Sequence, residues 1–351
     1  MINKSNWAIE PVPQDLDEAI WSKINQKTKP VGALGVIEEI AFRVARIQRN
    51  LSPSLKKPTV VVFAGDHGIA KSGVVNPYPQ EVTYQMVMNF LQGGAAINVL
   101  ARSAGMNVQI VDAGVNHSFD RSLPLVHAKL GNGTKDYRYG NAMDLHIAEQ
   151  GLVKGAEIVN DLHNVGVNVF GFGEMGIGNS SSAALIMSHI CNLPIDGCVG
   201  RGTGAEGDFL NQKINTLQEV VAFHQLSEES TSLQILVAYG GFEIAQMAGG
   251  MLKAASLGHV ILVDGFISTS AYLIAHKINP AVKEYALFSH RSNEQGHEKM
   301  LQFLDAKPIL SLSLRLGEGT GCAAAFPIIK MAVDMLNDMA SFESAGVSKS
   351  E

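Results

Sequence analysis

The sequence predicts an α/β fold with a doubly wound, mostly parallel, Rossmann-like sheet and a small helical lobe formed by the N- and C-terminal segments. Short apolar runs of strand length alternate along the chain with longer amphipathic runs. Parallel neighbours need helical crossover connections, so this alternation favours a parallel sheet. The short runs lead into glycine, acidic or histidine residues. Ligands of such sheets lie beyond the carboxyl ends of the strands, which is where we expect the site.

Six short apolar runs are predicted strands, and a polar segment follows each. They are residues 59–64 before Gly65-Asp66-His67-Gly68, 108–111 before Asp112-Ala113-Gly114, 167–170 before Gly171-Phe172-Gly173-Glu174, 260–263 before Asp264-Gly265, 284–288 before Ser289-His290, and 309–314 before the loop around Glu318. Helix-like segments separate the strands, for example residues 181–189, 250–257 and 323–336. The predicted site is therefore a composite of segments that are distant in sequence.

The helical lobe is predicted from residues 16–50, which precede the first strand. Apolar side chains recur there at helical spacing, at Ile37, Ile40, Val44 and Ile47. This segment is expected to join the C-terminal helix. The chain is then a single unit, residues 1–351, with a core α/β domain at about 58–321 and a lobe from about 14–50 plus 322–340.

Composition excludes several classes of protein. The net charge is −6 and no Lys/Arg-rich tract occurs, which argues against a protein that grips a nucleic-acid backbone. Cys191, Cys198 and Cys322 lack paired spacing, so neither a disulfide framework nor a structural zinc site is expected, and a cytoplasmic location fits. Residues 1–11 lack the apolar run of a secretory signal. The uncharged stretch 175–195 contains too many polar residues for a membrane span.

One alternative function is a Rossmann-type nicotinamide-cofactor oxidoreductase. Gly171-Phe172-Gly173-Glu174-Met175-Gly176 matches the dinucleotide fingerprint, and Asp196 follows about twenty residues later. Two features oppose this interpretation. Glu174 would lie beside the pyrophosphate, and Pro194 falls in the segment that should form the next strand. The glycines would otherwise serve tight turns, which leaves Glu174 unexplained.

A second alternative is a metallophosphoesterase, and a third is a non-catalytic nucleotide-binding module. Gly65-Asp66-His67-Gly68 is similar to a two-metal hydrolase motif, but it is one residue short and no further histidines follow at ligand spacing. A hydrogen-bonded strand end is the more common role of such a pair. We therefore predict no metal at this position.

Three glycine-rich loops are candidates for binding an anion: residues 176–182, 200–204 and 317–321. Unpaired amides at a helix N-terminus attract phosphate, and the third loop leads into a predicted helix with Arg315 and Thr320 beside it. The loop lacks the Gly-Lys-Ser/Thr ending of a triphosphate site, which favours a monophosphate. Lys213 would neutralise that phosphate, or else it is a solvated helix lysine.

Glu318 is an unusual residue in a phosphate-binding loop, because its carboxylate would repel the anion. It is more plausibly aimed at the reacting centre. If Leu316, Phe326 and Met175 restrict water, its pKa should rise toward the range of a general base. Glu174 offers a second carboxylate, so the two can divide proton acceptance and stabilisation of positive charge. A solvated loop glutamate is the alternative for either residue.

Six motifs occur in order over residues 29–336 and together resemble the nicotinate-nucleotide:dimethylbenzimidazole phosphoribosyltransferases. They are Lys29-Pro30-Val31-Gly32-Ala33-Leu34-Gly35, Gly65-Asp66-His67-Gly68, Gly171-Phe172-Gly173-Glu174-Met175-Gly176, Gly240-Gly241-Phe242-Glu243-Ile244, Val263-Asp264-Gly265-Phe266 and Arg315-Leu316-Gly317-Glu318-Gly319-Thr320-Gly321. Chance does not explain a match of all six in family order, whereas each alone is a weak signal.

The resemblance implies a glycosyltransferase, specifically a pentosyltransferase of cobalamin biosynthesis. It would transfer phosphoribosyl from nicotinate mononucleotide to 5,6-dimethylbenzimidazole, giving α-ribazole 5′-phosphate and nicotinate with anomeric inversion. No cofactor is implied, because nicotinate leaves from a pyridinium without Mg²⁺ or an acid. Family members are homodimers, so a homodimer is expected.

The resemblance also assigns roles by motif position. Glu318 would take the proton of the benzimidazole, with Glu174 near the ribose or the incoming base. The 5′-phosphate would lie against the 202–204 and 317–321 loops with Lys213, and the aromatic base would lie near Met175, Leu316 and residues 84–86. The complete set of expected substrate-binding residues is Gly202, Thr203, Gly204, Lys213, Arg315, Leu316, Gly317, Gly319, Thr320, Gly321, Met175, Gly176, Tyr84, Gln85, Met86 and Asp264.

Overall fold

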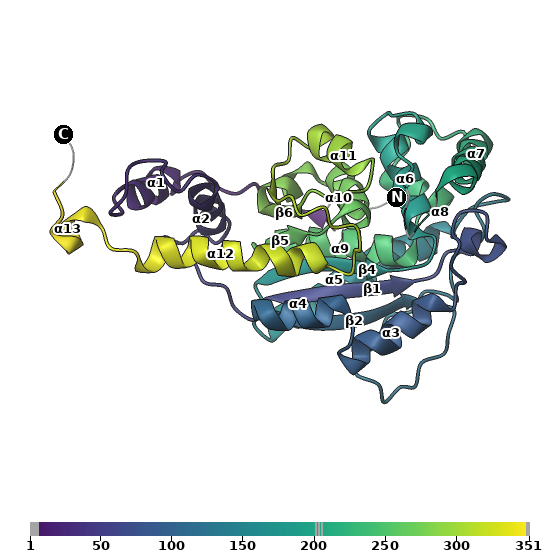
Figure 1. Cartoon of the computed structure of the whole chain (residues 1–351), viewed down its shortest axis with the longest axis horizontal. Helices are drawn as coiled ribbons and strands as arrows, with labels where there is room; N and C mark the ends of the chain where they lie inside the picture. Colours follow the sequence, from purple (N-terminus) through teal and green to yellow (C-terminus); the bar gives the residue numbers. More distant parts are fainter. Residues whose placement is uncertain (1–6, 201, 203, 205, 349–351) are drawn as a thin grey trace.

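The computed structural model describes residues 7–200, 202, 204 and 206–348, and its centre is one parallel sheet (Figure 1). In this part of the chain the sheet has seven strands in the order β3-β2-β1-β4-β5-β6-β7. They are β1 (Thr59–Gly65), β2 (Asn107–Gly114), β3 (Val126–His127), β4 (Val169–Met175), β5 (Val260–Val263), β6 (Ala286–His290) and β7 (Pro308–Leu310). The order extends the doubly wound 3-2-1-4-5-6 arrangement by one strand, which confirms the predicted fold class.

Helices cover both faces of the sheet, so the central strands are buried on both sides and are mainly apolar. Every residue of β1 and β5 is buried. One face carries α3 (Val82–Gln92), α4 (Ala96–Ala104) and α12 (Thr320–Asp338), and the other carries α5 (Leu145–Asn164), α9 (Phe242–Ser256) and α10 (Phe266–Ile278). Besides the two helices of the lobe, the described chain also contains α6 (Asn179–Ile190), α7 (Gly207–His224), α8 (Ser232–Tyr239), α11 (His297–Phe303) and α13 (Phe342–Ala345), with short 3-10 turns η2 (Gly68–Ser72), η3 (Ile195–Gly197) and η4 (Pro280–Tyr285).

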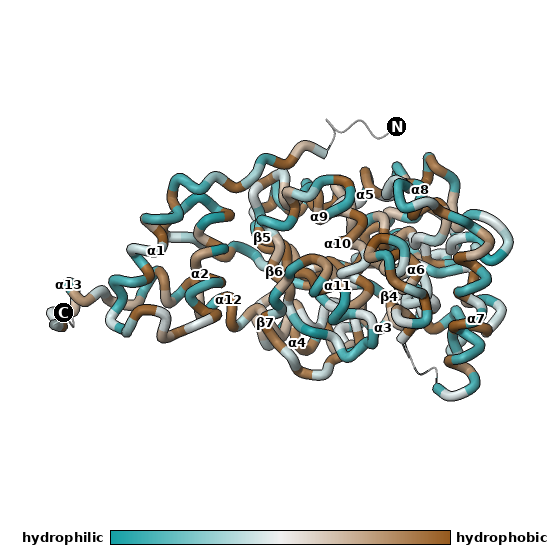
Figure 2. Tube along the Cα trace, turned by 90° about the horizontal axis from the view of Figure 1, so that it is seen from above, coloured by the Kyte–Doolittle hydropathy of each residue, from teal (hydrophilic) through white to brown (hydrophobic). Residues whose placement is uncertain are grey.

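The helical lobe lies at one end of the molecule in both views (Figures 1 and 2). There α1 (Asp17–Asn25) packs on α2 (Val36–Ile47), which packs on α12. The segments that follow α1 and α12 also pair directly, because Lys27 and Ser341 form an antiparallel bridge. This confirms that the N- and C-terminal segments form the lobe. However, α12 begins on the sheet, next to α4 and β4, and only then runs out to the lobe.

The extents of four strands differ from those expected. β2 runs on through Gly114, so Asp112-Ala113-Gly114 lies inside the strand rather than after it. β4 continues through Met175, so Gly171-Phe172-Gly173-Glu174 lies inside the strand rather than after it. β6 runs on through His290. β7 stops at Leu310 instead of continuing to residue 314, and residues 311–317 form no helix or strand. None of the described helices is both long and apolar enough to cross a membrane.

Candidate active site

The candidate site lies at the carboxyl ends of β1 and β4, which are neighbours in the sheet. After β1 the chain leads to α3 and α4 on one face, and after β4 it leads to α6, which packs on α10 at the other face. Ligands bind at such a topological switch point because the diverging connections leave a crevice. The two strand ends approach closely, since a Cβ on Gly176 would overlap the carbonyl oxygen of Gly65.

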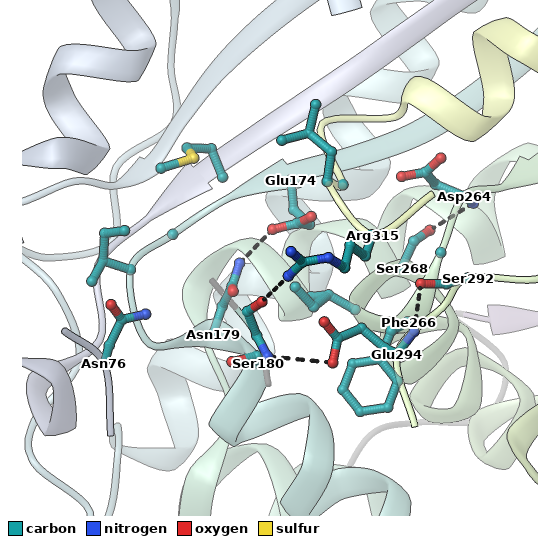
Figure 3. A pocket seen from close by; sticks show the side chains of 18 of the residues that line it. Asn76, Glu174, Asn179, Ser180, Asp264, Phe266, Ser268, Ser292, Glu294 and Arg315 are labelled. Carbon is teal, nitrogen blue, oxygen red and sulfur yellow. Dashed lines mark hydrogen bonds between the residues drawn. The ribbon is translucent and has the colours of Figure 1, made fainter. Parts of the chain in front are cut away.

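A cavity of about 80 Å³ opens beside the end of β4 (Figure 3). Eight of the residues that the sequence singles out line it: Glu174, Met175, Gly176, Gly202, Asp264, Arg315, Leu316 and Gly317. Typical ligand pockets hold about 300–1,000 Å³, so a whole nucleotide needs more room than this cavity provides. Arg315 and Leu316 are exposed at its mouth, where their displacement would widen it.

Glu174 points from the end of β4 into this cavity and is 5% exposed. Its carboxyl group accepts a hydrogen bond from the Asn179 side-chain amide. Burial raises the pKa of Glu174 to about 8, and the neighbouring carboxyl groups of Asp264, Glu243 and Glu318 add to the effect. Without ligand, Glu174 therefore holds a proton at neutral pH. The alternative of a solvated loop glutamate is wrong for this residue.

Lys213 approaches the same cavity from α7, on the side of Ser180. It is 1% exposed, and its Nζ donates a hydrogen bond to the Ser180 hydroxyl at 3.1 Å. Burial lowers the pKa of Lys213 to about 8, against the opposing effect of Glu294. The interpretation of Lys213 as a solvated helix lysine is therefore wrong. A buried cation beside a hydroxyl is suited to an anionic group of a ligand.

The loop 200–204 contributes one described residue, Gly202, to the lining of the cavity. Gly202 lies at the cavity, where its carbonyl accepts a hydrogen bond from the Arg315 guanidinium at 3.3 Å and its amide donates to Glu294 at 3.4 Å. Gly204 is exposed. Thr203 lies outside the described residues. The structure thus brings Gly202, Lys213 and Arg315 together, as the phosphate prediction requires.

Asp264 follows β5 and closes the N-terminus of α12. Its carboxylate accepts the backbone N–H groups of Gly319 at 3.1 Å, Gly321 at 2.6 Å and Cys322 at 3.2 Å. The expectation that the amides of loop 317–321 hold a phosphate therefore needs correction, because Asp264 already occupies this helix terminus. Burial raises the pKa of Asp264 to about 7, although these N–H groups oppose the shift. Thr320 is also engaged within the loop, since its hydroxyl and its amide both donate to the carbonyl of Gly317.

Glu318 lies in the turn before α12 and is 4% exposed. Its Oε2 accepts the N–H of Ile97, in the first turn of α4, at 3.4 Å. Burial raises the pKa of Glu318, and the Asp264 carboxylate adds to the rise. The expected surroundings are correct only in part, because Phe326 is buried but Leu316 is 57% exposed. Glu318 is not a solvated loop glutamate either, and it is turned toward α4 rather than lining the cavity of Figure 3.

The residues expected near the aromatic base lie on α3, on the same face of the sheet as α4. The ring of Tyr84 stacks on His117 with centroids 4.4 Å apart, Met86 packs partly against the core, and Gln85 is exposed. These three residues do not line the cavity of Figure 3. α3 reaches the crevice through Thr83, whose hydroxyl accepts the N–H of Ile177 at 3.1 Å.

The Asp66-His67 motif forms a hydrogen-bonded strand end. His67 is fully buried, with Nε2 at 2.7 Å from a Glu243 carboxylate oxygen and Nδ1 at 3.0 Å from the Ser182 hydroxyl. Asp66 accepts the N–H of Asn116 at 2.7 Å. Within the described ranges, no three His, Cys, Asp or Glu side chains gather in a way that could hold a metal ion. The geometry therefore gives no support to the metallophosphoesterase alternative.

The dinucleotide fingerprint is a chance match. A pyrophosphate site needs the glycines in a turn that opens a helix, whereas Gly171 and Gly173 lie inside β4. They leave room for α12 and the turn before it, because a Cβ on Gly173 would lie 2.5 Å from the carbonyl carbon of Glu318. The interpretation of these glycines as tight turns is wrong for the same reason. The oxidoreductase alternative loses its basis.

The cavity also contains side chains that the sequence prediction leaves out. His290, at the end of β6, is 3% exposed and has its Nε2 3.8 Å from Asp264, and burial lowers its pKa. Asn179 and Ser180 begin α6, and Glu294 follows β6. The signal for His290 was its place directly after a predicted strand. The α6 pair lies within the first predicted anion-binding loop, residues 176–182.

Comparison with known proteins gives matches over nearly the whole chain. The family described as "Phosphoribosyltransferase" matches residues 9–347. A protein of Dechloromonas aromatica named nicotinate-nucleotide–dimethylbenzimidazole phosphoribosyltransferase is 49% identical over 337 residues, 96% of this chain and 97% of its own length. A protein of the same name from Shewanella oneidensis is 47% identical over 342 residues, 97% of either chain. The crystal structure of CobT from Thermus thermophilus superposes with a TM-score of 0.91 at 37% identity, covering 96% of this chain and all of that one.

Proposed function

The chain belongs to the nicotinate-nucleotide–dimethylbenzimidazole phosphoribosyltransferase family, and we propose that Glu318 is the general base of the transfer that it catalyses. The phosphoribosyl group of nicotinate mononucleotide passes to 5,6-dimethylbenzimidazole, which gives α-ribazole 5′-phosphate and nicotinate for cobalamin synthesis. One nitrogen of the incoming base bonds to the anomeric carbon as the bond to nicotinate breaks, with inversion at that carbon. The other nitrogen loses its proton, so a proton acceptor must face the incoming base.

The burial of Glu318 at the switch point is the observation that carries this assignment. A carboxylate in water is a weak base, but removal from water raises its pKa toward that of an effective proton acceptor. Glu318 is 4% exposed and its pKa is raised for this reason. The benzimidazole would approach from the α3 side of the crevice, between Tyr84 and Met86 on α3 and the pair formed by Met175 at the end of β4 and Leu316 in the loop before α12. A largely apolar surface of this kind suits an aromatic base.

The 5′-phosphate of nicotinate mononucleotide would lie at the opposite side of the crevice, in the cavity of Figure 3. Lys213 and Arg315 supply positive charge there, and Ser180 and the amides of Gly176 and Gly202 lie nearby. We also keep Thr203 and Gly204 as proposed phosphate-binding residues, because they directly follow Gly202 in the sequence. The amides of Gly319 and Gly321 do not enter it, because they bind Asp264.

Glu174 would lie between the phosphate and the incoming base, beside the ribose. In its protonated form it can donate a hydrogen bond to a ribose hydroxyl. Once ionised, it stabilises the positive charge that develops on the ribose ring as nicotinate leaves. The pKa near 8 makes both forms accessible close to neutral pH.

We further infer that the protein is a cytoplasmic homodimer. The three cysteines are free, as is usual in a reducing compartment. Large apolar side chains are exposed on the helical lobe, with Val31 73% and Val36 53% exposed, and exposed patches of this kind often mark interfaces between subunits.

The decisive assay follows α-ribazole 5′-phosphate by chromatography after incubation with nicotinate mononucleotide and dimethylbenzimidazole. Glu318→Gln is expected to lower kcat by about 10²-fold or more, as for loss of a general base, with KM for both substrates changed much less. Glu157→Gln, an exposed acid on α5, is the matched control and should retain the parent kcat. Near-normal turnover of Glu318→Gln would remove Glu318 from the proposed role, and absence of product from the parent would refute the activity itself.

A further inference from the structure

The turn that carries Glu318 has an unusual backbone. Gly317, Glu318 and Gly319 all lie in the left-handed region, with φ values of 84°, 62° and 83°. Glycine adopts this region freely, whereas the Cβ of any other residue is crowded against the neighbouring backbone there. Glu318 therefore keeps this conformation only because surrounding contacts enforce it.

The contacts within the turn are insufficient to hold it in place on the sheet. The Thr320 hydroxyl donates to the carbonyl of Gly317 at 2.8 Å, and the Thr320 amide donates to the same oxygen at 3.0 Å. These bonds close the turn on itself. Gly173 of β4 offers a surface without a side chain, on which the Glu318 backbone lies, but this contact is van der Waals packing without a hydrogen bond.

Asp264 supplies the missing attachment from a different strand. It follows β5 and is 2% exposed. One carboxylate oxygen accepts the amide of Gly319, directly after Glu318, and the other accepts the amides of Gly321 and Cys322. Asp264 is itself held by α10, because its backbone amide donates to the Ser268 hydroxyl at 3.3 Å. The turn is thereby tied to the end of β5.

We propose that Asp264 is a positioning residue for the transfer: by holding the amides of Gly319, Gly321 and Cys322, it keeps Glu318 in its left-handed turn with the carboxylate aimed at the incoming base. This inference rests on the proposed role of Glu318. Asp264 also lines the cavity of Figure 3, so the test must separate this role from the expected contact with substrate.

A double-mutant cycle tests the proposal. In Asp264→Asn, one acceptor oxygen becomes an NH₂ group that cannot accept an amide N–H. We expect kcat to fall about tenfold or more, since small misplacements of a catalytic group cost about this much or more, with KM for nicotinate mononucleotide within about twofold. In a Glu318→Gln background the same change should lower kcat by less than about twofold, because no base remains to be misplaced.

Ser289→Ala is the matched control. Ser289 is buried in β6 and its hydroxyl lies 3.5 Å from the Cys322 sulfur, so it touches the same first turn of α12 without bonding to its amides. This variant should keep the parent kcat. Thermal unfolding of each variant shows whether it is folded. If Asp264→Asn does not fold, Asp264→Glu makes the same comparison, because it keeps the carboxylate but displaces it by one methylene.

Two results would overturn the inference while leaving the function intact: kcat losses that multiply fully in the double variant, or a raised KM for nicotinate mononucleotide with unchanged kcat. Either would identify Asp264 as a substrate contact. Near-normal turnover of Glu318→Gln would instead overturn the role of Glu318, and this inference with it. The single and double variants therefore separate the two failures.

A measurement on the unaltered protein tests the geometry independently. Labelling with ¹⁵N-cysteine gives amide signals from Cys191, Cys198 and Cys322 only. Because the pKa of Asp264 is raised to about 7, the Cys322 amide shift should titrate near that pH, while the other two signals serve as internal controls. A Cys322 amide shift that responds to pH no more than the controls and is also unchanged between the parent protein and Asp264→Asn would exclude the bond on which the proposal depends.

Discussion

Glu174 and Asp264 are buried acids at the site, and both carry raised pKa values, about 8 and about 7. Among the described residues, no lysine or arginine lies at ion-pair distance from either carboxyl group. The buried imidazole of His290 is 3.8 Å from Asp264, but burial lowers its pKa. Burial without a counter-charge costs folding free energy whenever the group is ionised. The site therefore makes the stability of the protein dependent on pH.

For Glu174 the direction of this dependence follows from its two pKa values. The folded value, about 8, lies above the ordinary value of 4.5, so between these pH values the folded state holds a proton that the unfolded state has lost. The free energy of unfolding therefore falls as the pH rises from about 4.5 through 8. Glu174→Gln, which mimics the protonated form, should gain stability relative to the parent as the pH rises. Melting temperatures measured from pH 5 to 9 would show this.

The control for that experiment is Glu157→Gln, whose melting-temperature difference from the parent should not change with pH. A constant difference for Glu174→Gln as well would contradict the raised pKa of Glu174.

Lys213 is expected to act on substrate binding more than on turnover. Lys213→Met should raise KM for nicotinate mononucleotide about tenfold or more, as for loss of a charge-assisted hydrogen bond worth about 1.5–3 kcal/mol. The parent KM should also rise as the pH passes about 8, where Lys213 loses its proton, and the variant should lack that rise. Steady-state kinetics over pH 6.5–9.5 would measure both effects. Lys330→Met, an exposed lysine on α12, is the control, and an equal KM in both variants would exclude a phosphate contact by Lys213.

For single residues, the sequence indicates which side chains could take part in the reaction better than it indicates which groups those side chains contact. Glu318 and Lys213 could be singled out because charge beside glycine-rich loops is unusual. The actual partners of Asp264 could not, because an acid after a strand looks the same whether it faces a ligand or the amides of a helix that begins more than fifty residues later, at Thr320. Whether Tyr84 and Met86 face the base is likewise a matter of side-chain direction on α3 and stays a prediction.

Among the elements, β4 determines how closely the turn of Glu318 approaches the sheet. Gly173→Ala would introduce a Cβ 2.5 Å from the carbonyl carbon of Glu318, so the turn must move. We expect kcat to fall about tenfold or more, together with a lower melting temperature. Gly140→Ala is the control, since a Cβ there has no neighbour within 4 Å. An unchanged kcat in Gly173→Ala would show that the turn tolerates displacement.

The elements themselves could largely be predicted, because apolar runs and helical spacing are local patterns. The exceptions have a physical cause. Gly171 and Gly173 suggested the end of a strand, yet in β4 they are required by the close approach of Cys322 and Glu318 from distant parts of the chain. β3 has two residues, too few for any periodicity. Residues 311–314 continue the apolar pattern of β7 but find no partner strand.

On the scale of the whole molecule, the proposed homodimer predicts a particle of twice the chain mass of 37.5 kDa in light scattering. Introducing charge on the lobe, with Val31→Asp and Val36→Asp together, should shift the protein toward the monomer, because a charge is costly to bury in an interface. Val165→Asp, 58% exposed between α5 and β4, should leave the mass unchanged. A parent protein of monomer mass would contradict the proposal.

The pairing of the segments after α1 and α12 has a consequence for how the protein is made. Lys27 bonds through its Nζ to the carbonyl of Met339, 312 residues later, and α2 packs on α12. A ribosome releases α1 and α2 before it synthesises α12, which covers α2 and follows roughly 15–60 s later at about 5–20 residues per second. Throughout that interval the apolar side of α2, including Ile40 and Val44, lacks its final partner. The same helix, α12, begins at the residue after Gly319, so both the lobe and the turn of Glu318 depend on the synthesis of one helix.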